Sequence, residues 1–199
     1  TLTEPPKDSM VIATPFAGHP RAFYYNQKLV GMRASGEVTF RGRQYRFDPT
    51  DSFAILDWGR GVWTFDNTWY WSSAAGEIGG KVFGFNLGYG FGDTSAATEN
   101  MLFYDGMAHK LDQVTFQIPQ KGNGEDDYMT PWRFTSNDGR FEALFEPVLD
   151  RSAMTKVGPL CSDQHQVFGA FTGSAVLDDG TRISMDRFFG FAEKVRNKW

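Results

Sequence analysis

The chain has 199 residues, 41% of them hydrophobic, and a formal net charge of −4 at pH 7. This length can bury the core of one domain. Lys and Arg are dispersed along a slightly acidic chain, which argues against a nucleic-acid partner, and no apolar run approaches the ~18 residues that a membrane span needs. Aromatic residues make up 16% of the chain, with 19 Phe and 6 Trp beside 22 Gly. This composition favours a β protein with large pockets or thick sheet packing.

Cys161 is the single cysteine of the chain. An internal disulfide and a cysteine-based zinc site are therefore excluded, and a reducing compartment is expected, so we predict a cytoplasmic location. The histidines at positions 19, 109 and 165 show no metal-ligand spacing. We expect neither a metal nor a cofactor.

The first residues are rich in proline, with Pro5, Pro6, Pro15 and Pro20. Proline fixes its own backbone angle and lacks an N–H donor, so residues 1–20 are predicted to be an extended lead-in and residues 21–199 a single domain. No secretory signal pattern is present, and the chain does not begin with Met. We interpret it as a processed protein or the C-terminal part of a longer one.

The rest of the chain predicts short strands separated by turns. They cover residues 21–30, 31–40, 44–47, 52–58, 68–74, 81–92, 101–104, 109–116, 132–136, 140–145, 167–177 and 181–185. Asp105-Gly106, Asp138-Gly139 and Asp179-Gly180 lie between consecutive strands, and Asp-Gly is a strong hairpin signal. Turns recur roughly every ten residues, as in barrels and sandwiches. We predict an all-β fold with little helix, an antiparallel meander of hairpins that closes into a barrel.

The strand at residues 81–92 is the most informative stretch. Phe83, Phe85, Leu87, Tyr89 and Phe91 alternate with Gly84, Asn86, Gly88, Gly90 and Gly92. Because side chains alternate between the faces of a strand, one face is an aromatic wall and the other is nearly bare backbone. Glycine weakens a strand, so the bare face predicts a sharp bend, or the close approach of another segment or a ligand.

The residues before this strand contain four tryptophans, Trp58, Trp63, Trp69 and Trp71. Each could be ordinary core packing, but together, beside a glycine face, they indicate a cavity with aromatic walls. Such walls bind flat or apolar ligands and stabilise cations. Asn86 is the single polar side chain of the glycine face, so we expect it to project toward whatever approaches that face.

Several charged and polar residues are candidates for chemistry. Asp57 precedes Arg60 by three residues, and the two could form a structural ion pair or hold a carboxyl group beside the pocket. Glu99 and Asn100 end the loop after the central strand, where they either cap the loop or contact a ligand. His109 shares a strand face with Leu111, while Lys110 and Asp112 form a solvated pair on the other face.

Seven motifs in order resemble the uncharacterised family called domain of unknown function 2804. They are Asp57-Trp58-Gly59-Arg60-Gly61-Val62-Trp63, Trp69-Tyr70-Trp71, the glycine-rich strand from Phe83 to Gly92, Thr98-Glu99-Asn100, His109-Lys110-Leu111-Asp112, Gln166-Val167-Phe168-Gly169 and Gly190-Phe191-Ala192-Glu193-Lys194-Val195. The resemblance implies a lipocalin-like barrel, similar to the hydroxyneurosporene synthase and tocopherol cyclase group. Members are longer, so it also implies an absent N-terminal part as a partner.

Three functions remain open at this point. The first is binding of an apolar small molecule in an aromatic-lined barrel pocket; the second is a hydratase or cyclase that protonates an isoprenoid-like substrate with a buried carboxylic acid. Asp57 and Glu99 are the candidate acids. The candidate ligand-binding residues are Arg60, Trp63, Trp69, Trp71, Asn86, Asn100 and His109. The third is a structural module whose bare face docks on the absent N-terminal part.

Overall fold

The computed structural model describes all residues from 1 to 199 and consists of strands joined by turns and loops, without a helix. The strands are β1 (Leu2–Thr3), β2 (Met10–Pro15), β3 (Phe23–Ala34), β4 (Gly36–Phe40), β5 (Arg43–Phe47), β6 (Phe53–Val62), β7 (Asp66–Ile78), β8 (Lys81–Tyr89), β9 (Met101–Tyr104), β10 (Met107–Lys110), β11 (Val114–Gln117), β12 (Trp132–Ser136), β13 (Phe141–Val157), β14 (Leu160–Val176) and β15 (Arg182–Lys198). The predicted all-β class is confirmed. The chain has no helix that is long and apolar enough to cross a membrane.

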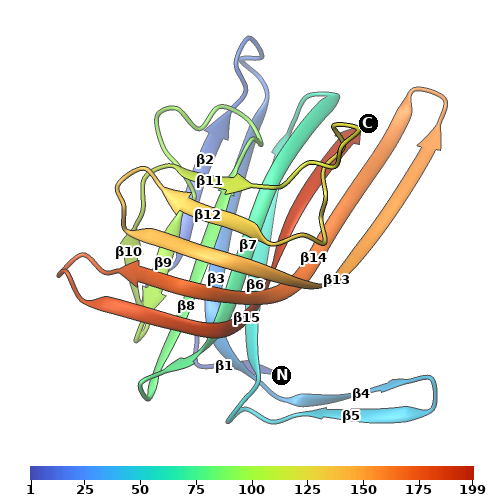
Figure 1. Ribbon diagram of the computed structural model, residues 1–199. Helices are drawn as coiled ribbons and strands as arrows, with labels where there is room; N and C mark the ends of the chain where they lie inside the picture. The colour runs from blue at the N-terminus through green and yellow to red at the C-terminus, as the bar shows by residue number, and fades with distance from the viewer.

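The larger sheet has nine antiparallel strands in the order β10-β9-β8-β7-β15-β14-β13-β12-β11. Figure 1 shows how it curls, so that β11 and β12 pass across the front of β7 and β8. Its edge strands β10 and β11 do not pair with each other. The predicted closed barrel is therefore wrong: the sheet is an open half-barrel whose concave side is filled by side chains.

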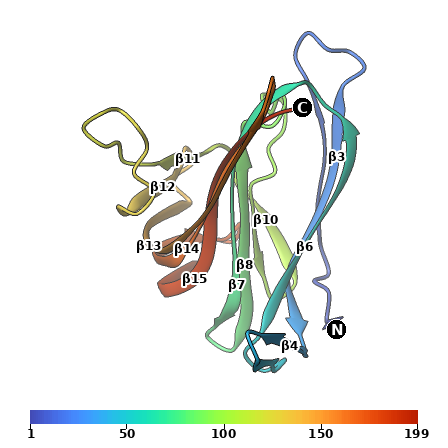
Figure 2. The ribbon, with the colours of Figure 1, turned by 90° about the vertical axis from the view of Figure 1, so that its right-hand side faces the viewer.

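The N-terminal part forms a second, smaller sheet. Its central strand β3 pairs with β1, β2 and β6. Figure 2 shows this sheet as a separate layer beside β7 and β8. A small apolar cluster of Met10, Val30 and Phe103 joins the two layers. The hairpin of β4 and β5 extends away from both sheets (Figure 1).

The main core lies on the concave side of the larger sheet. Phe83, Phe85 and Leu87 of β8 are fully buried there, together with the other residues of a 20-residue cluster. Burial of these rings supplies the hydrophobic free energy that holds the curl together. The predicted aromatic wall is thus confirmed up to Tyr89. Phe91 departs from it, because Gly90 adopts a φ of +94° after the strand ends and Phe91 packs instead against Trp69 on the opposite side of the sheet.

The glycine face of β8 is covered by the chain itself. A Cβ atom on Gly84 would lie 2.6 Å from Cγ1 of Val30 in β3, and one on Gly88 would lie 2.5 Å from Oε1 of Glu99. The predicted close approach of another segment is confirmed. Since β3 and the loop around Glu99 already occupy this face, it is not left bare for an absent N-terminal part, as the structural-module alternative supposed.

Several strands are longer than predicted, among them β7 and β15, and the predicted strand 109–116 is divided between β10 and β11. β6 continues from Phe53 to Val62, through the Trp58-Gly59 stretch expected to end it, because its glycines stay in register with β3. β13 and β14 are each 17 residues long and pair through Val157 and Leu160. The sequence predicted only their core halves, since residues 146–166 lack the alternation of a half-buried strand.

Candidate functional site

A cavity of about 250 Å³ lies between the smaller sheet and the convex face of the larger one. Its lining comes from five aromatic and five polar residues: Tyr24, Asn26, Lys28, Asp57, Trp63, Trp69, Trp71, Phe91, Glu99 and Glu193. The pocket was expected inside the barrel. It lies outside the curl, because the main core fills the concave side next to β8.

The aromatic walls follow from strand alternation. Trp69 and Trp71 point from β7 into the cavity, while Tyr70 between them stacks on Tyr89 at the core side. Phe91 is the centre of the ring cluster: its centroid lies 5.0 Å from that of Tyr24, 5.8 Å from that of Trp63 and 5.5 Å from that of Trp69. These edge-to-face contacts fix the rings that border the cavity.

Glycines in β6 make room for Tyr24. A Cβ atom on Gly59 would lie 2.6 Å from the Tyr24 ring, and one on Gly61 would lie 2.1 Å from the carbonyl oxygen of Phe23. The tyrosine ring can therefore lie across β6 and close one side of the cavity. The Gly59 and Gly61 positions, which suggested a turn in the sequence, serve this close approach.

Lys28 supplies the positive charge of the cavity. Its Nζ lies 2.9 Å from Oε2 of Glu99, 3.8 Å from Oδ2 of Asp57 and 4.0 Å from the centroid of the Trp71 ring. The side chain is 5% exposed, so the ion pair with Glu99 and the cation–π contact offset its desolvation. Glu99 is thus the ion-pair partner of a buried cation.

Glu193 is the most deeply buried carboxyl group of the cavity, with 8% of the residue exposed. Burial raises its pKa, although hydrogen bonds that Trp69 Nε1 donates at 2.9 Å and Gln166 Nε2 donates at 3.1 Å oppose the rise. No Lys or Arg lies within ion-pair distance of it. Burial without an ion-pair partner therefore favours the protonated form of Glu193.

Asp57 and Tyr24 are also perturbed. Burial raises the pKa of Asp57 and the Glu99 charge adds to the rise, while Lys28 opposes it. Because the Asp57 side chain is 35% exposed, solvent weakens these effects relative to those at Glu193. Burial, and after it the carboxylates of Asp57 and Glu99, raise the pKa of the Tyr24 phenol, which stays protonated.

Two asparagines have opposite roles. Asn86 lies behind the lining: its Oδ1 accepts a hydrogen bond from Trp71 Nε1 at 2.7 Å, and its Nδ2 donates to the backbone oxygen of Glu99 at 2.9 Å. It projects, as expected, toward the segment that approaches the glycine face, and there it positions the wall of the cavity. Asn26 of β3 lines the cavity, is 2% exposed, and its Oδ1 has no hydrogen-bond partner.

Arg60 and Asn100 lie outside the cavity. Arg60 is three residues beyond Asp57 in the continuous strand β6, so the two side chains leave opposite faces and form no ion pair. Asn100 accepts a hydrogen bond from the Gly88 backbone N–H at 2.7 Å and donates to the Asp112 carbonyl at 2.7 Å. It ties the loop that carries Glu99 to β8.

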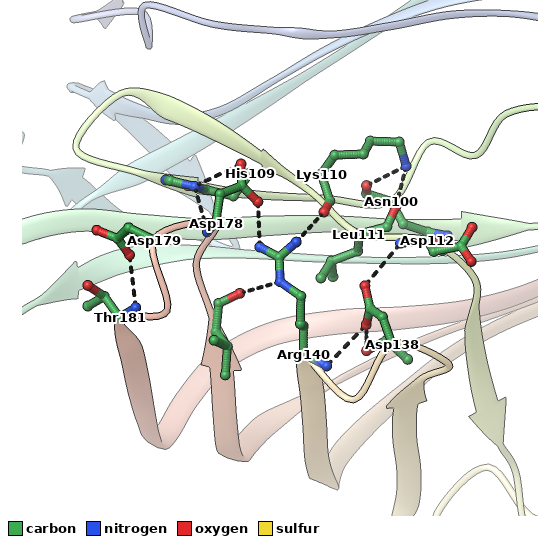
Figure 3. Close-up of polar contacts among 12 residues, drawn as sticks. Asn100, His109, Lys110, Leu111, Asp112, Asp138, Arg140, Asp178, Asp179 and Thr181 are labelled. Atoms are coloured by element: carbon green, nitrogen blue, oxygen red, sulfur yellow. Dashed lines mark hydrogen bonds and ion pairs between the residues drawn. The ribbon is translucent and has the colours of Figure 1, made fainter.

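His109 belongs to a different polar cluster, shown in Figure 3. Arg140 lies at its centre and donates to Asp178 at 2.6 Å and to the Lys110 carbonyl at 2.8 Å. His109 Nδ1 lies 3.4 Å from Oδ2 of Asp178. These contacts join β10 to the turns beside β13, β14 and β15, and His109 does not reach the aromatic cavity.

A larger and more polar groove, of about 1010 Å³, opens on the other face of the larger sheet. His165 lies in it, with Nδ1 2.7 Å from Oδ2 of Asp150 and the ring stacked 3.8 Å from the Tyr128 ring. Lys194 and Tyr128 both donate to Asp126, so the charged groups of the groove pair with one another. No group of three or more His, Cys, Asp or Glu side chains in the chain could hold a metal ion.

The structure brings together Asp57, Trp63, Trp69, Trp71 and Glu99 from the sequence-based set. Sequence reasoning missed Tyr24, Asn26, Lys28, Phe91 and Glu193. The sequence does contain a signal for Tyr24, Asn26 and Lys28, because they lie at every second position of one strand and therefore share a face. Glu193 is followed by the equally polar Lys194, so the sequence does not indicate which of the two side chains faces the cavity.

Three comparisons with known proteins bear on this chain. No curated protein sequence matches it. The solved structure of kievitone hydratase from Nectria haematococca aligns with 96% of this chain at 10% sequence identity and a TM-score of 0.49, a likeness that carries no inference about function. The chain spans 62% of that protein's length. The model of the family described as Domain of unknown function (DUF2804) matches residues 1–199, and the chain therefore belongs to this family.

Proposed function

We propose that this protein binds a small molecule with a flat, apolar body in the cavity between its two sheets. The main supporting observation is that five aromatic side chains and the buried, unpaired Asn26 Oδ1 surround one cavity of about 250 Å³. Ligand sites combine an apolar lining with a few fixed polar groups in this way. The volume suits a ligand of one or two rings or a short isoprenoid chain.

Calorimetric titration with a panel of flat aromatic and isoprenoid compounds tests the proposal. Trp63 and Trp58 form a matched pair, because they are 41% and 47% exposed but only Trp63 lines the cavity. Trp63→Ala should weaken binding of any panel ligand about tenfold or more, while Trp58→Ala should leave it unchanged. Failure of the whole panel, or equal effects of the two variants, would contradict the proposal.

The second candidate is an enzyme that protonates an alkene of such a ligand. The observation that favours it is Glu193, a buried carboxyl group without an ion-pair partner that lines the same cavity as Trp69 and Trp71. The O–H bond of the acid breaks as a C–H bond forms, the aromatic faces stabilise the carbocation, and water or an internal hydroxyl captures it and returns a proton to the carboxylate.

Product analysis separates turnover from binding. Panel ligands that bind should be incubated with the protein and examined by mass spectrometry for hydration or cyclisation. Glu193→Gln should form no product even at ligand concentrations that saturate the cavity. Product formation by this variant would exclude Glu193 as the acid, and intact ligands throughout would leave simple binding.

A further inference from the structure

The charges that border the aromatic cavity do not balance. Asp57, Glu99 and Glu193 contribute three carboxyl groups and Lys28 one ammonium group. Lys28 Nζ is 2.9 Å from Glu99 and 3.8 Å from Asp57. One cation therefore serves two carboxyl groups and the third has none, so a cationic ligand would find Asp57 and Glu193 as partners and would itself favour the ionised form of Glu193.

Hydrogen-bonding capacity points in the same direction. Trp69 Nε1 already donates to Glu193, and Trp71 Nε1 already donates to Asn86. The acceptor Oδ1 of Asn26, in a residue that is 2% exposed, has no partner. A buried acceptor without a donor costs free energy until a donor reaches it. A donor group on the ligand would satisfy this buried acceptor.

The aromatic walls are suited to the same kind of group. The ammonium of Lys28 lies 4.0 Å from the centroid of the Trp71 ring, which shows that this wall accommodates a desolvated cation. Tyr24, Trp63, Trp69 and Phe91 border the rest of the cavity. Their negative ring faces attract positive charge and repel anions.

We propose that the ligand of this cavity is an organic amine in its protonated form, with a flat apolar body of one or two rings. The inference rests on the proposed function and names its ligand class. The ammonium group sits between Asp57 and Glu193, donates to Asn26 Oδ1, and leaves Lys28 paired with Glu99. The apolar body lies against Trp63, Trp69 and Phe91.

Three probes of one shape test the charge requirement. They are 2-(1-naphthyl)ethylamine, the corresponding alcohol and the corresponding carboxylic acid, which are cationic, neutral and anionic at pH 7. Calorimetry should find the amine bound about tenfold more tightly than the alcohol, with no measurable binding of the acid. An alcohol or acid that binds as tightly as the amine overturns the amine inference but leaves the aromatic site standing. Absence of binding by all three overturns the inference and the proposed function together.

Asp57→Asn tests the origin of the preference. The side chain is 35% exposed, so the variant is expected to fold. Affinity for the amine should fall about tenfold while affinity for the alcohol stays unchanged. The matched control is Asp186→Asn, an exposed carboxylate of β15 that does not line the cavity. Asn26→Leu, which removes the free acceptor, should lower amine affinity without a change in overall charge. Equal losses for amine and alcohol in Asp57→Asn would contradict the proposed contact.

Discussion

The two faces of the larger sheet have different roles, although the same strands form both: one face packs the core and the other borders the cavity. On the concave side Phe83, Phe85 and Leu87 of β8 are fully buried in a continuous apolar cluster. On the convex side the alternate positions Gly84 and Gly88 carry no side chain, and β3 and Glu99 approach the backbone instead. The first face supplies stability, and the second supplies space in which Lys28 and three carboxyl groups are held among aromatic rings.

This comparison implies that stability and binding can be separated by mutation. Substitutions on the concave side should unfold the protein, whereas substitutions at the cavity should change its charge balance or its ligand.

Phe85→Ala should have the largest effect. Phe85 is fully buried and contacts the rings of Phe141 and Phe171. Loss of the ring removes buried apolar area and leaves a cavity, so the free energy of unfolding should fall by about 3–5 kcal/mol in chemical denaturation. The control is Phe189→Ala, because Phe189 is 60% exposed. Equal losses in both variants would mean that the concave side is not the main core.

Lys28→Met should come next. Methionine keeps the apolar length of the side chain but leaves Glu99, whose side chain is 17% exposed, without its cation. Unfolding free energy should fall by about 3 kcal/mol, because a buried charge remains uncompensated. The double variant Lys28→Met, Glu99→Gln should recover most of the loss. If it does not, the ion pair is not the reason for the position of Lys28.

Gly88→Ala tests the close approach on the convex side. A methyl group there would lie 2.5 Å from Glu99 Oε1 and 3.2 Å from the Tyr70 carbonyl oxygen, so Glu99 must shift. A loss of about 1–2 kcal/mol in unfolding free energy is expected, with weaker binding at the cavity. Gly122→Ala is the control, since nothing lies within 4 Å of a Cβ atom at that position. A neutral Gly88→Ala would show that the space beside Glu99 is looser than described.

The smallest expected effect is a pH dependence from Glu193. Its pKa is raised in the folded protein by burial. The folded state therefore holds a proton that the unfolded state releases above about pH 4.3, so the stability that Glu193 contributes is present in acid and falls as pH rises through the folded pKa. Chemical denaturation of the wild type and of Glu193→Gln across this pH range tests this. As the pH rises, the unfolding free energy of the wild type should fall relative to that of the variant. A difference that is constant with pH would contradict the raised pKa.

Much of the fold follows from local sequence signals. Asp105-Gly106 and Asp138-Gly139 do form hairpin turns, and the alternation of β8 correctly separates its aromatic face from its glycine face. Closure of the sheet is not a local property. It depends on whether the edge strands β10 and β11 meet, and no pattern of alternation within either strand decides that.

Only part of the site could be predicted, again because the packing of distant strands is not a local property. The tryptophans and acidic residues of the cavity are conspicuous in the sequence, but Lys28 and Glu193 come from strands that are far apart in the chain and meet only through sheet packing. Of the two alternatives for Asp57, the ion pair with Arg60 does not form, because a continuous β6 places residues three apart on opposite faces, whereas the carboxyl group does lie beside the cavity. His109 and Asn100 were plausible by residue type alone, and both have structural partners.

The most direct test of the account is a crystal structure of the protein with the tightest-binding probe of the panel. The account predicts electron density for the ligand between β3 and β7, against Trp63 and Trp69, with its polar group near Asn26 and Glu193. Density instead in the polar groove beside His165, with the aromatic cavity unchanged, would contradict it. That result would move the binding site to the other face of the same sheet.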